Sequence, residues 1–163
     1  MISPEDKQNY QSMTQNELNE GFILACRAGD LDIVKYLLTC SDLKEHADIH
    51  AQDDEGFREA CWSGHLEVVK YLLTSQDLAE HADIHAQQDS GFLNACYNKN
   101  FHILDYLVIE YNMNISKELK HNLITSDTEG HKHALQLIEA RDLAGKINGE
   151  LEEKSFNKHK VKL

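Results

Sequence analysis

Apolar residues recur along this chain at the spacing of amphipathic helices. Phe22, Ala25 and Cys26 lie three or four residues apart, so they share one face of a predicted helix. A second stripe with the same spacing runs from Leu66 to Leu73, and polar stretches separate such segments. One Pro and eight Gly leave little turn chemistry for an all-β chain. The pattern therefore predicts an all-α fold.

The pattern is also an internal repeat with a period of 35 residues. Gly21–Glu55 aligns with Gly56–Ser90 without a gap, and 23 of the 35 positions are identical. A weaker third copy starts at Gly91, and the trace of a fourth starts at Gly130. Each unit predicts two helices and a polar connection. Because so short a unit buries its apolar stripe only by stacking, we expect a solenoid.

The boundaries of the first helix in each unit are marked by capping residues. Asn19, Asp54 and Asp89 occupy one repeat position just before that helix, and each can accept a bond from a free backbone N–H. Gly29 and Gly64 follow the same helix, at a position that favours left-handed backbone.

The two ends of the chain differ from the repeats, as capping segments of a solenoid do. We expect a short helix over about 4–12, a capping box made by Thr14 and Glu17, and closing helices over 116–125 and 130–153. The basic segment 154–163 is expected to be disordered. The domain prediction is a single unit over 1–153, with a basic tail at 154–163. Its repeats lie near 21–55, 56–90 and 91–116, with a degenerate cap over 117–153.

The stretch Gly64-His65-Leu66-Glu67-Val68-Val69-Lys70-Tyr71-Leu72-Leu73, followed by Ala82-Asp83-Ile84, resembles the ankyrin repeat. The resemblance covers about residues 14–140, and the repeats look like those of arrays from intracellular bacteria and giant viruses. It implies an ankyrin-repeat solenoid of about three and a half helix pairs, with capping helices at both ends and a binding function on the concave face. The family's opening Thr-Pro-Leu-His is absent. The span from Asp48 to Ala60 is shorter than the family's, so we expect short fingers, and the span from Leu73 to His81 is longer, so we expect an extra helical turn or a loop at 75–80.

The net charge of the chain limits the kinds of molecule that it is expected to bind. Sixteen Lys and Arg oppose 28 Asp and Glu, so the formal net charge is −12. An acidic chain argues against nucleic-acid binding and favours a protein partner with a basic patch. The longest apolar run, 22–26, is far shorter than the roughly 20 residues of a membrane helix. No secretory signal is visible, so we expect a cytoplasmic protein that binds no membrane.

Cysteine and histidine are the residue types of this chain that could act as nucleophiles or bind a metal ion. Cys26, Cys61 and Cys96 recur inside the small apolar helix face, which indicates packed residues rather than nucleophiles. The paired histidines of the connections, at 46, 50, 81 and 85, have too wide a repeat spacing to converge on one metal ion. By the resemblance, His46 and His81 stand at the family's turn glycine, where positive φ is expected. We predict no catalysis, metal or cofactor, and keep a metal-sensing protein as the alternative.

The informative positions are those at which the repeats differ. Arg27, Trp62 and Tyr97 share one position, which in ankyrin proteins points into the concave groove, and Arg, Trp and Tyr are enriched in binding hot spots. The opposing interpretation is that Trp62 and Tyr97 pack against a neighbouring repeat. The predicted partner-binding residues are Arg27, Arg58, Glu59, Trp62, Ser63, Tyr97 and Asn98.

The function predicted from these observations is a non-enzymatic protein–protein interaction module, most simply a monomer. A second setting for the same biochemistry is a secreted or viral effector that binds a host protein in the host cytosol. That alternative depends on the resemblance alone.

Overall fold

The computed structural model describes residues 2–160, with side chains described for residues 2–152, and this part of the chain is helical without any strand. The all-α prediction is confirmed. The elements are α1 (Pro4–Gln11), α2 (Gln15–Ala28), α3 (Leu31–Thr39), α4 (Ala51–Ser63), α5 (Leu66–Thr74), α6 (Ala86–Tyr97), α7 (Phe101–Asp105), the π-helical turn η1 (Tyr106–Glu110), α8 (Lys117–Thr125) and α9 (Glu129–Lys160).

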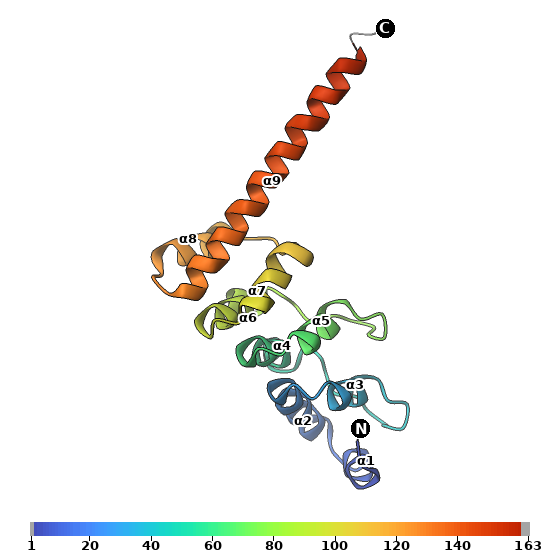
Figure 1. Ribbon diagram of the computed structural model, residues 1–163. Coiled ribbons are helices and arrows are strands. Elements are labelled where there is room, and N and C mark those ends of the chain that lie inside the picture. Colours follow the sequence, from blue (N-terminus) through green and yellow to red (C-terminus); the bar gives the residue numbers. More distant parts are fainter. Residues whose placement is uncertain (1, 161–163) are drawn as a thin grey trace.

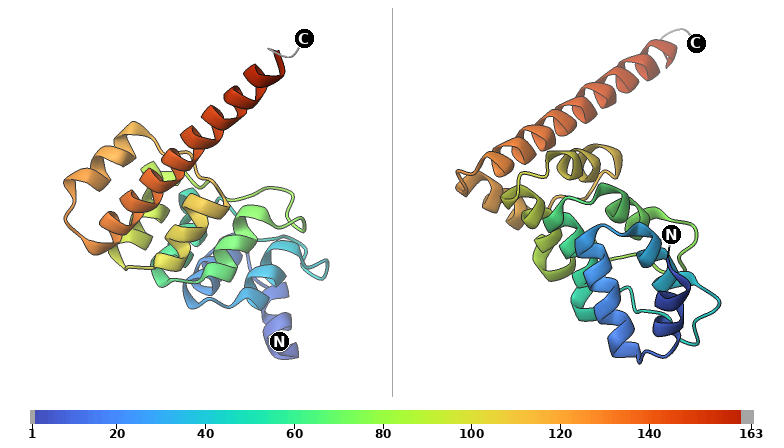
Figure 2. Two further views of the ribbon diagram at one scale, coloured as in Figure 1. Left: turned by 45° about the horizontal axis from the view of Figure 1, so that its top comes forward. Right: turned by 60° about the horizontal axis from the view of Figure 1, so that its bottom comes forward.

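The helices form a stack of pairs (Figure 1). The first helices of the three units, α2, α4 and α6, pack side by side in one row, and α3, α5 and α7 form a second row beside them. The connections after α3 and α5 project from the edge of the second row. Figure 2 shows the same stack from two further directions, with α9 leaving its C-terminal end as a long rod. In the described range, no helix is both long enough and apolar enough to cross a membrane.

Local signals set the helix ends. Thr14 and Glu17 form the predicted capping box at the start of α2, which therefore begins at Gln15, six residues before Gly21. Gly29 and Gly64 adopt left-handed φ values of 75° and 85° at the ends of α2 and α4, as expected. At the matching position of the third unit, Lys99 takes the same conformation with φ 58°.

Repeated aromatic side chains form the core. Phe22, Phe57 and Phe92 are almost completely buried, one in each unit. Gly56 lets α4 approach α2 closely, because a Cβ there would lie 2.6 Å from the Phe22 ring. The three repeated cysteines are buried beside these rings, which confirms that they are packing residues.

The predicted caps Asn19, Asp54 and Asp89 do not cap their helices. Asn19 lies inside α2, and its Oδ1 accepts a 2.8 Å bond from the Asp48 N–H of the following connection. Asp54 is buried and accepts a 2.9 Å bond from the Asp83 N–H in the same way. Asp89 instead accepts a 2.6 Å bond from the His85 Nδ1 of its own unit. Residues 52–54 and 87–89 have left-handed backbone angles, whereas Asn19 continues a regular helix.

Histidines close the long connections in place of turn glycines. His46 donates from Nε2 to the Cys40 carbonyl at 3.0 Å, and His81 donates to the Ser75 carbonyl at 2.9 Å. Neither has a positive φ, so the expectation for these two positions was wrong. The ring reaches back to the end of the preceding helix, and the long loop predicted at 75–80 is closed by that bond instead of by a tight turn.

The C-terminal end of the stack is covered by α9. Gly130 touches the Cys96 carbonyl, and the first turns of α9 bury Ala134 and Ile138 against the third unit. Helix α8 packs on α9. The expected disordered tail is helical as far as Lys160, because no Pro or Gly interrupts the sequence after Gly149. Residues 161–163 of that tail lie outside the described residues.

Candidate binding face on helices α2, α4 and α6

The C-terminal ends of the first helices carry a row of large exposed side chains. Arg27, Trp62 and Tyr97 hold equivalent positions on α2, α4 and α6, so the stack places them one after another along the row (Figure 1). Trp62 is 49% exposed and Tyr97 is 59% exposed. Both are large aromatic side chains, and they lie exposed at the position of the repeat that Arg27 holds in the first unit.

An ion pair joins the first two units on this face. The Arg27 Nε donates to the Glu59 Oε2 at 2.7 Å. The pair holds the Arg27 guanidinium at Glu59 of α4, one turn before Trp62, and leaves the Arg27 side chain 52% exposed. The glutamate raises the pKa of Arg27 through this bond and its charge. Because the pair is solvent-exposed, its contribution to stability is small.

Tyr97 lies at the junction between the face and the C-terminal cap. Its ring meets the His131 ring edge-on, with 4.9 Å between the centroids. His131 is buried, and its Nδ1 is bonded to the Thr128 hydroxyl. Burial lowers the pKa of His131, which favours the neutral ring. One edge of Tyr97 is therefore fixed by α9, while most of its surface stays open.

The remaining predicted residues are engaged in local contacts. The Arg58 guanidinium donates to the Gln52 and Asp53 carbonyls at 3.0 and 3.1 Å, which supports the left-handed segment. Ser63 is half-buried beside the Gly64 turn. Asn98 is exposed, and its Nδ2 donates to the Asn94 carbonyl. Arg58 thus turns toward its own connection, away from the row that Arg27 and Trp62 form.

Two residues of the face were not among those predicted. Leu24 is 58% exposed on α2, one turn before Arg27. Asn94 is its counterpart on α6 and reaches the Arg58 carbonyl at 3.4 Å. The signal that could have found them is the repeat itself, because Leu24, Glu59 and Asn94 share one position at which every unit differs. We call Leu24, Arg27, Glu59, Trp62, Asn94 and Tyr97 the binding face, as the candidate surface for a partner.

Three of the four cysteines are shielded by burial, and two histidines of the connections are bonded to carboxylates. Burial raises the pKa of the Cys26 and Cys61 thiols and raises the pKa of Cys96 to about 12, so all three stay protonated at neutral pH. His50 and His85 donate from Nδ1 to Asp54 and Asp89. Within the described residues, no three side chains of His, Cys, Asp or Glu gather as a metal site would require.

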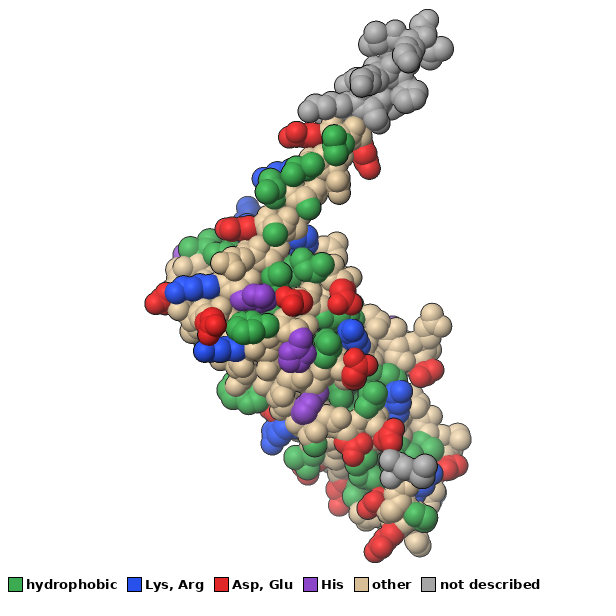
Figure 3. All heavy atoms as spheres, viewed as in Figure 1, with side chains coloured by type: hydrophobic (Ala, Val, Ile, Leu, Met, Phe, Trp, Pro, Cys, Tyr) green, Lys and Arg blue, Asp and Glu red, His purple; other side chains and the backbone are tan. Residues whose placement is uncertain are grey.

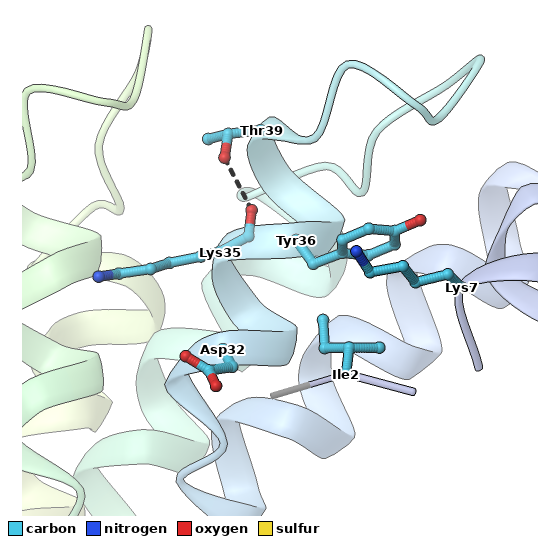
Figure 4. A pocket seen from close by; sticks show the side chains of 6 residues that line it. All are labelled: Ile2, Lys7, Asp32, Lys35, Tyr36 and Thr39. Atoms are coloured by element: carbon cyan, nitrogen blue, oxygen red, sulfur yellow. Dashed lines mark hydrogen bonds between the residues drawn. The ribbon is translucent and has the colours of Figure 1, made fainter. Parts of the chain in front are cut away.

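A shallow hollow of about 350 Å³ lies beside α1 and α3, and none of its six lining residues belongs to the binding face (Figure 4). Its polar groups serve the fold. The Thr39 hydroxyl donates to the Lys35 carbonyl at 2.8 Å, and the Lys7 ammonium lies 5.7 Å from the centre of the Tyr36 ring. These groups do not converge on one point, so the hollow offers no arrangement of nucleophile and base.

Comparison with known proteins identifies the repeat. The family model of ankyrin repeats in three copies matches residues 6–88, just over half of the chain. No curated protein and no solved structure matches the chain. Ankyrin repeats indicate a module for binding other proteins, and proteins built from them are generally non-enzymatic. With its stacked helix pairs and its matching sequence, the chain belongs to the ankyrin repeat family.

Proposed function

We propose that this protein binds a protein partner through the binding face, with Trp62 and Tyr97 as the apolar anchors. The observation that carries the proposal is the half-exposed Trp62 indole on a helix whose Phe57 and Cys61 are fully buried. Trp and Tyr supply large contact areas with few rotatable bonds, so ordering them at an interface costs little entropy.

The charges around these anchors define the kind of partner. Glu59 lies beside Trp62, and the whole chain has a formal net charge of −12. Acidic side chains are frequent over the N-terminal half of the surface in Figure 3. Such a surface steers a partner whose contact patch is basic around an apolar centre, and association then slows as salt screens the attraction.

Affinity capture from a cell lysate tests the proposal, with wild-type protein compared with Trp62→Ala. The matched control is Ile109→Ala, which removes an exposed apolar side chain (51% exposed) from η1, outside the binding face. We expect Trp62→Ala to lose a partner that wild type and the control retain, while all three proteins still melt cooperatively as folded proteins. If all three proteins capture the same partners equally well, the binding face is not the surface that holds the partner.

The same capture addresses the biological setting. A partner from the organism that makes the protein supports an interaction inside its own cytoplasm, whereas a partner found only in host lysate supports an effector. The loop histidines favour a structural role over metal sensing, because His46 and His81 are bonded to backbone carbonyls. Zinc titration by calorimetry with wild-type protein tests that assignment, and heat at micromolar zinc would contradict it.

A further inference from the structure

The C-terminal half of α9 projects beyond the helical stack (Figures 1 and 2). Every residue from Asp142 to Glu152 is exposed. Among them, Leu143, Ile147 and Leu151 are 59%, 49% and 58% exposed. They are four residues apart, so they lie along one face of the helix. Figure 3 shows hydrophobic side chains following one another along this rod. We call these three residues the α9 stripe.

This segment has poor intrinsic stability as a helix on its own. It contains Gly145 and Gly149, and glycine disfavours helix because it loses the most backbone freedom. Neither glycine permits a close approach within the molecule, since a Cβ at either position would meet nothing within 4 Å. About three turns without tertiary packing form only a marginal helix in water. A second surface against the stripe would supply the missing packing.

The charged residues beside the stripe can pair with the same residues of a second copy of the helix. Lys146 and Glu150 are four residues apart on the same side of it. Within the residues whose side chains are described, neither makes an ion pair. When two copies of the helix cross in antiparallel orientation at Ile147, Leu143 of one copy meets Leu151 of the other. Lys146 then lies beside Glu150 of the other copy, and the two-fold axis repeats both contacts.

We propose that the α9 stripe is a homodimer interface, in which two copies of this chain pair through antiparallel α9 helices crossing at Ile147. Each chain has a formal net charge of −12, and the antiparallel orientation places the two acidic bodies at opposite ends of the helix pair. An anionic membrane is a poorer occupant of the stripe itself, because Asp142, Glu150 and Glu152 outnumber Lys146 beside it, and the lysines that follow in α9 begin only at residue 154.

The interface is small, so the dimer is weak. Three apolar side chains from each copy bury less than the roughly 1,200 Å² of a stable complex. We expect a dissociation constant on the order of tens of micromolar, a range typical of weak interfaces. This inference does not depend on the binding face, which lies on other helices.

Sedimentation equilibrium of the full chain tests the proposal over about 2 µM to about 500 µM, since dimerisation follows mass action. We expect wild type to pass from monomer to dimer across this range and Ile147→Asp to stay monomeric. Ile124→Asp is the matched control, because Ile124 is 61% exposed on α8, away from the stripe. It should dimerise as wild type does. A wild type that stays monomeric, or a dimer that survives Ile147→Asp, overturns the proposal.

Charge exchange tests the orientation. Lys146→Glu and Glu150→Lys each place like charges opposite one another, so each should weaken the dimer about tenfold or more. An equal mixture of the two variants should pair, because every cross-copy contact is then attractive, and the double variant should dimerise as wild type does. Equal association of all these proteins overturns the antiparallel arrangement. A monomer that floats with phosphatidylserine vesicles and loses this binding on Ile147→Asp overturns the homodimer in favour of lipid.

Discussion

Phe57 and Trp62 lie five residues apart on α4, yet their surroundings are opposite. Phe57 is 1% exposed and touches the glycine of the next unit, whereas Trp62 is 49% exposed. The repeat explains the difference. Position 57 faces the neighbouring first helix, and position 62 faces away from the stack. Size and hydrophobicity alone do not decide which aromatic residue belongs to the core.

This difference predicts unequal effects of truncation. Phe57→Ala should lower the free energy of unfolding by about 3–5 kcal/mol, as buried aromatic residues do. Trp62→Ala should lower it by clearly less, on the order of 1 kcal/mol, because about half of the Trp62 side chain is already exposed in the folded state. Urea denaturation measures both values. A loss of several kcal/mol from Trp62→Ala would restore the interpretation in which Trp62 packs against the adjacent repeat.

His131 predicts how stability depends on pH. Its pKa is lowered by burial in the folded state, so below about pH 6.5 the unfolded chain binds more protons at this site. The contribution of the neutral ring is complete above that pH and is lost as the pH falls through the lower folded-state pKa. The groups around the site are Tyr97 and Thr128, with the Lys99–Glu129 ion pair on the adjacent turn.

His131→Gln isolates this effect, because glutamine does not titrate. The free energy of unfolding of wild type, minus that of the variant, should decrease between about pH 7.5 and about pH 5. Urea denaturation at several pH values measures it, and the comparison cancels the other histidines. Parallel pH profiles for the two proteins would show that His131 is not the group responsible.

At the scale of the helices, the decisive contact is the approach of one first helix to the next. The second and third units begin with Gly56 and Gly91, where a Cβ would come within 2.6 Å of Phe22 or Phe57. Gly21 holds the same repeat position but faces Leu37 at 3.6 Å, an ordinary contact distance. One residue type at one repeat position therefore has two different structural roles.

The two glycines predict opposite outcomes for the same substitution. Gly56→Ala should destabilise the protein by about 1–3 kcal/mol, because the added methyl group forces the Phe22 ring to move. Gly21→Ala should be neutral or should stabilise by up to about 1 kcal/mol, since alanine is the better helix former. Thermal melting of both variants decides the question, and equal losses would contradict the close packing of α4 on α2.

At the scale of the whole molecule, α9 has two parts with different surroundings. Its first turns pack on the third unit, and Arg141 donates from Nη1 to the Met113 carbonyl at 2.8 Å. Beyond Arg141 every described side chain is exposed. The solenoid therefore ends structurally at Arg141, although the helix continues.

Two truncations test this division. A chain that ends at Arg141 should melt within about 2 °C of wild type at low micromolar concentration, because no packed side chain is removed. A chain that ends at Thr128 should melt several degrees lower, because it exposes the core residues that α9 covers. Differential scanning calorimetry measures both. A large loss from the first truncation would mean that the projecting helix stabilises the stack.

Much of the fold could be predicted from the sequence, because it depends on periodic and local chemistry. The period of 35 residues predicts the stack, and the buried cysteines follow from the small apolar face. The capping box at Thr14 and the glycines at 29 and 64 predict helix ends from interactions within a few residues. These features need no knowledge of what lies beside each helix.

Only the tertiary structure determined the contacts between residues that are far apart in the chain. Aspartate is a residue type that caps helices, but the Asp54 carboxylate accepts a hydrogen bond from the Asp83 N–H of the next connection. Arg58 could line a groove, but it supports its own left-handed segment. Leu24 stands at the repeat position that Glu59 and Asn94 hold in the other units, and the packing of the helices in the stack leaves it exposed. Local sequence determines which bonds a side chain can make, and the packing of neighbouring units determines which partners come within reach.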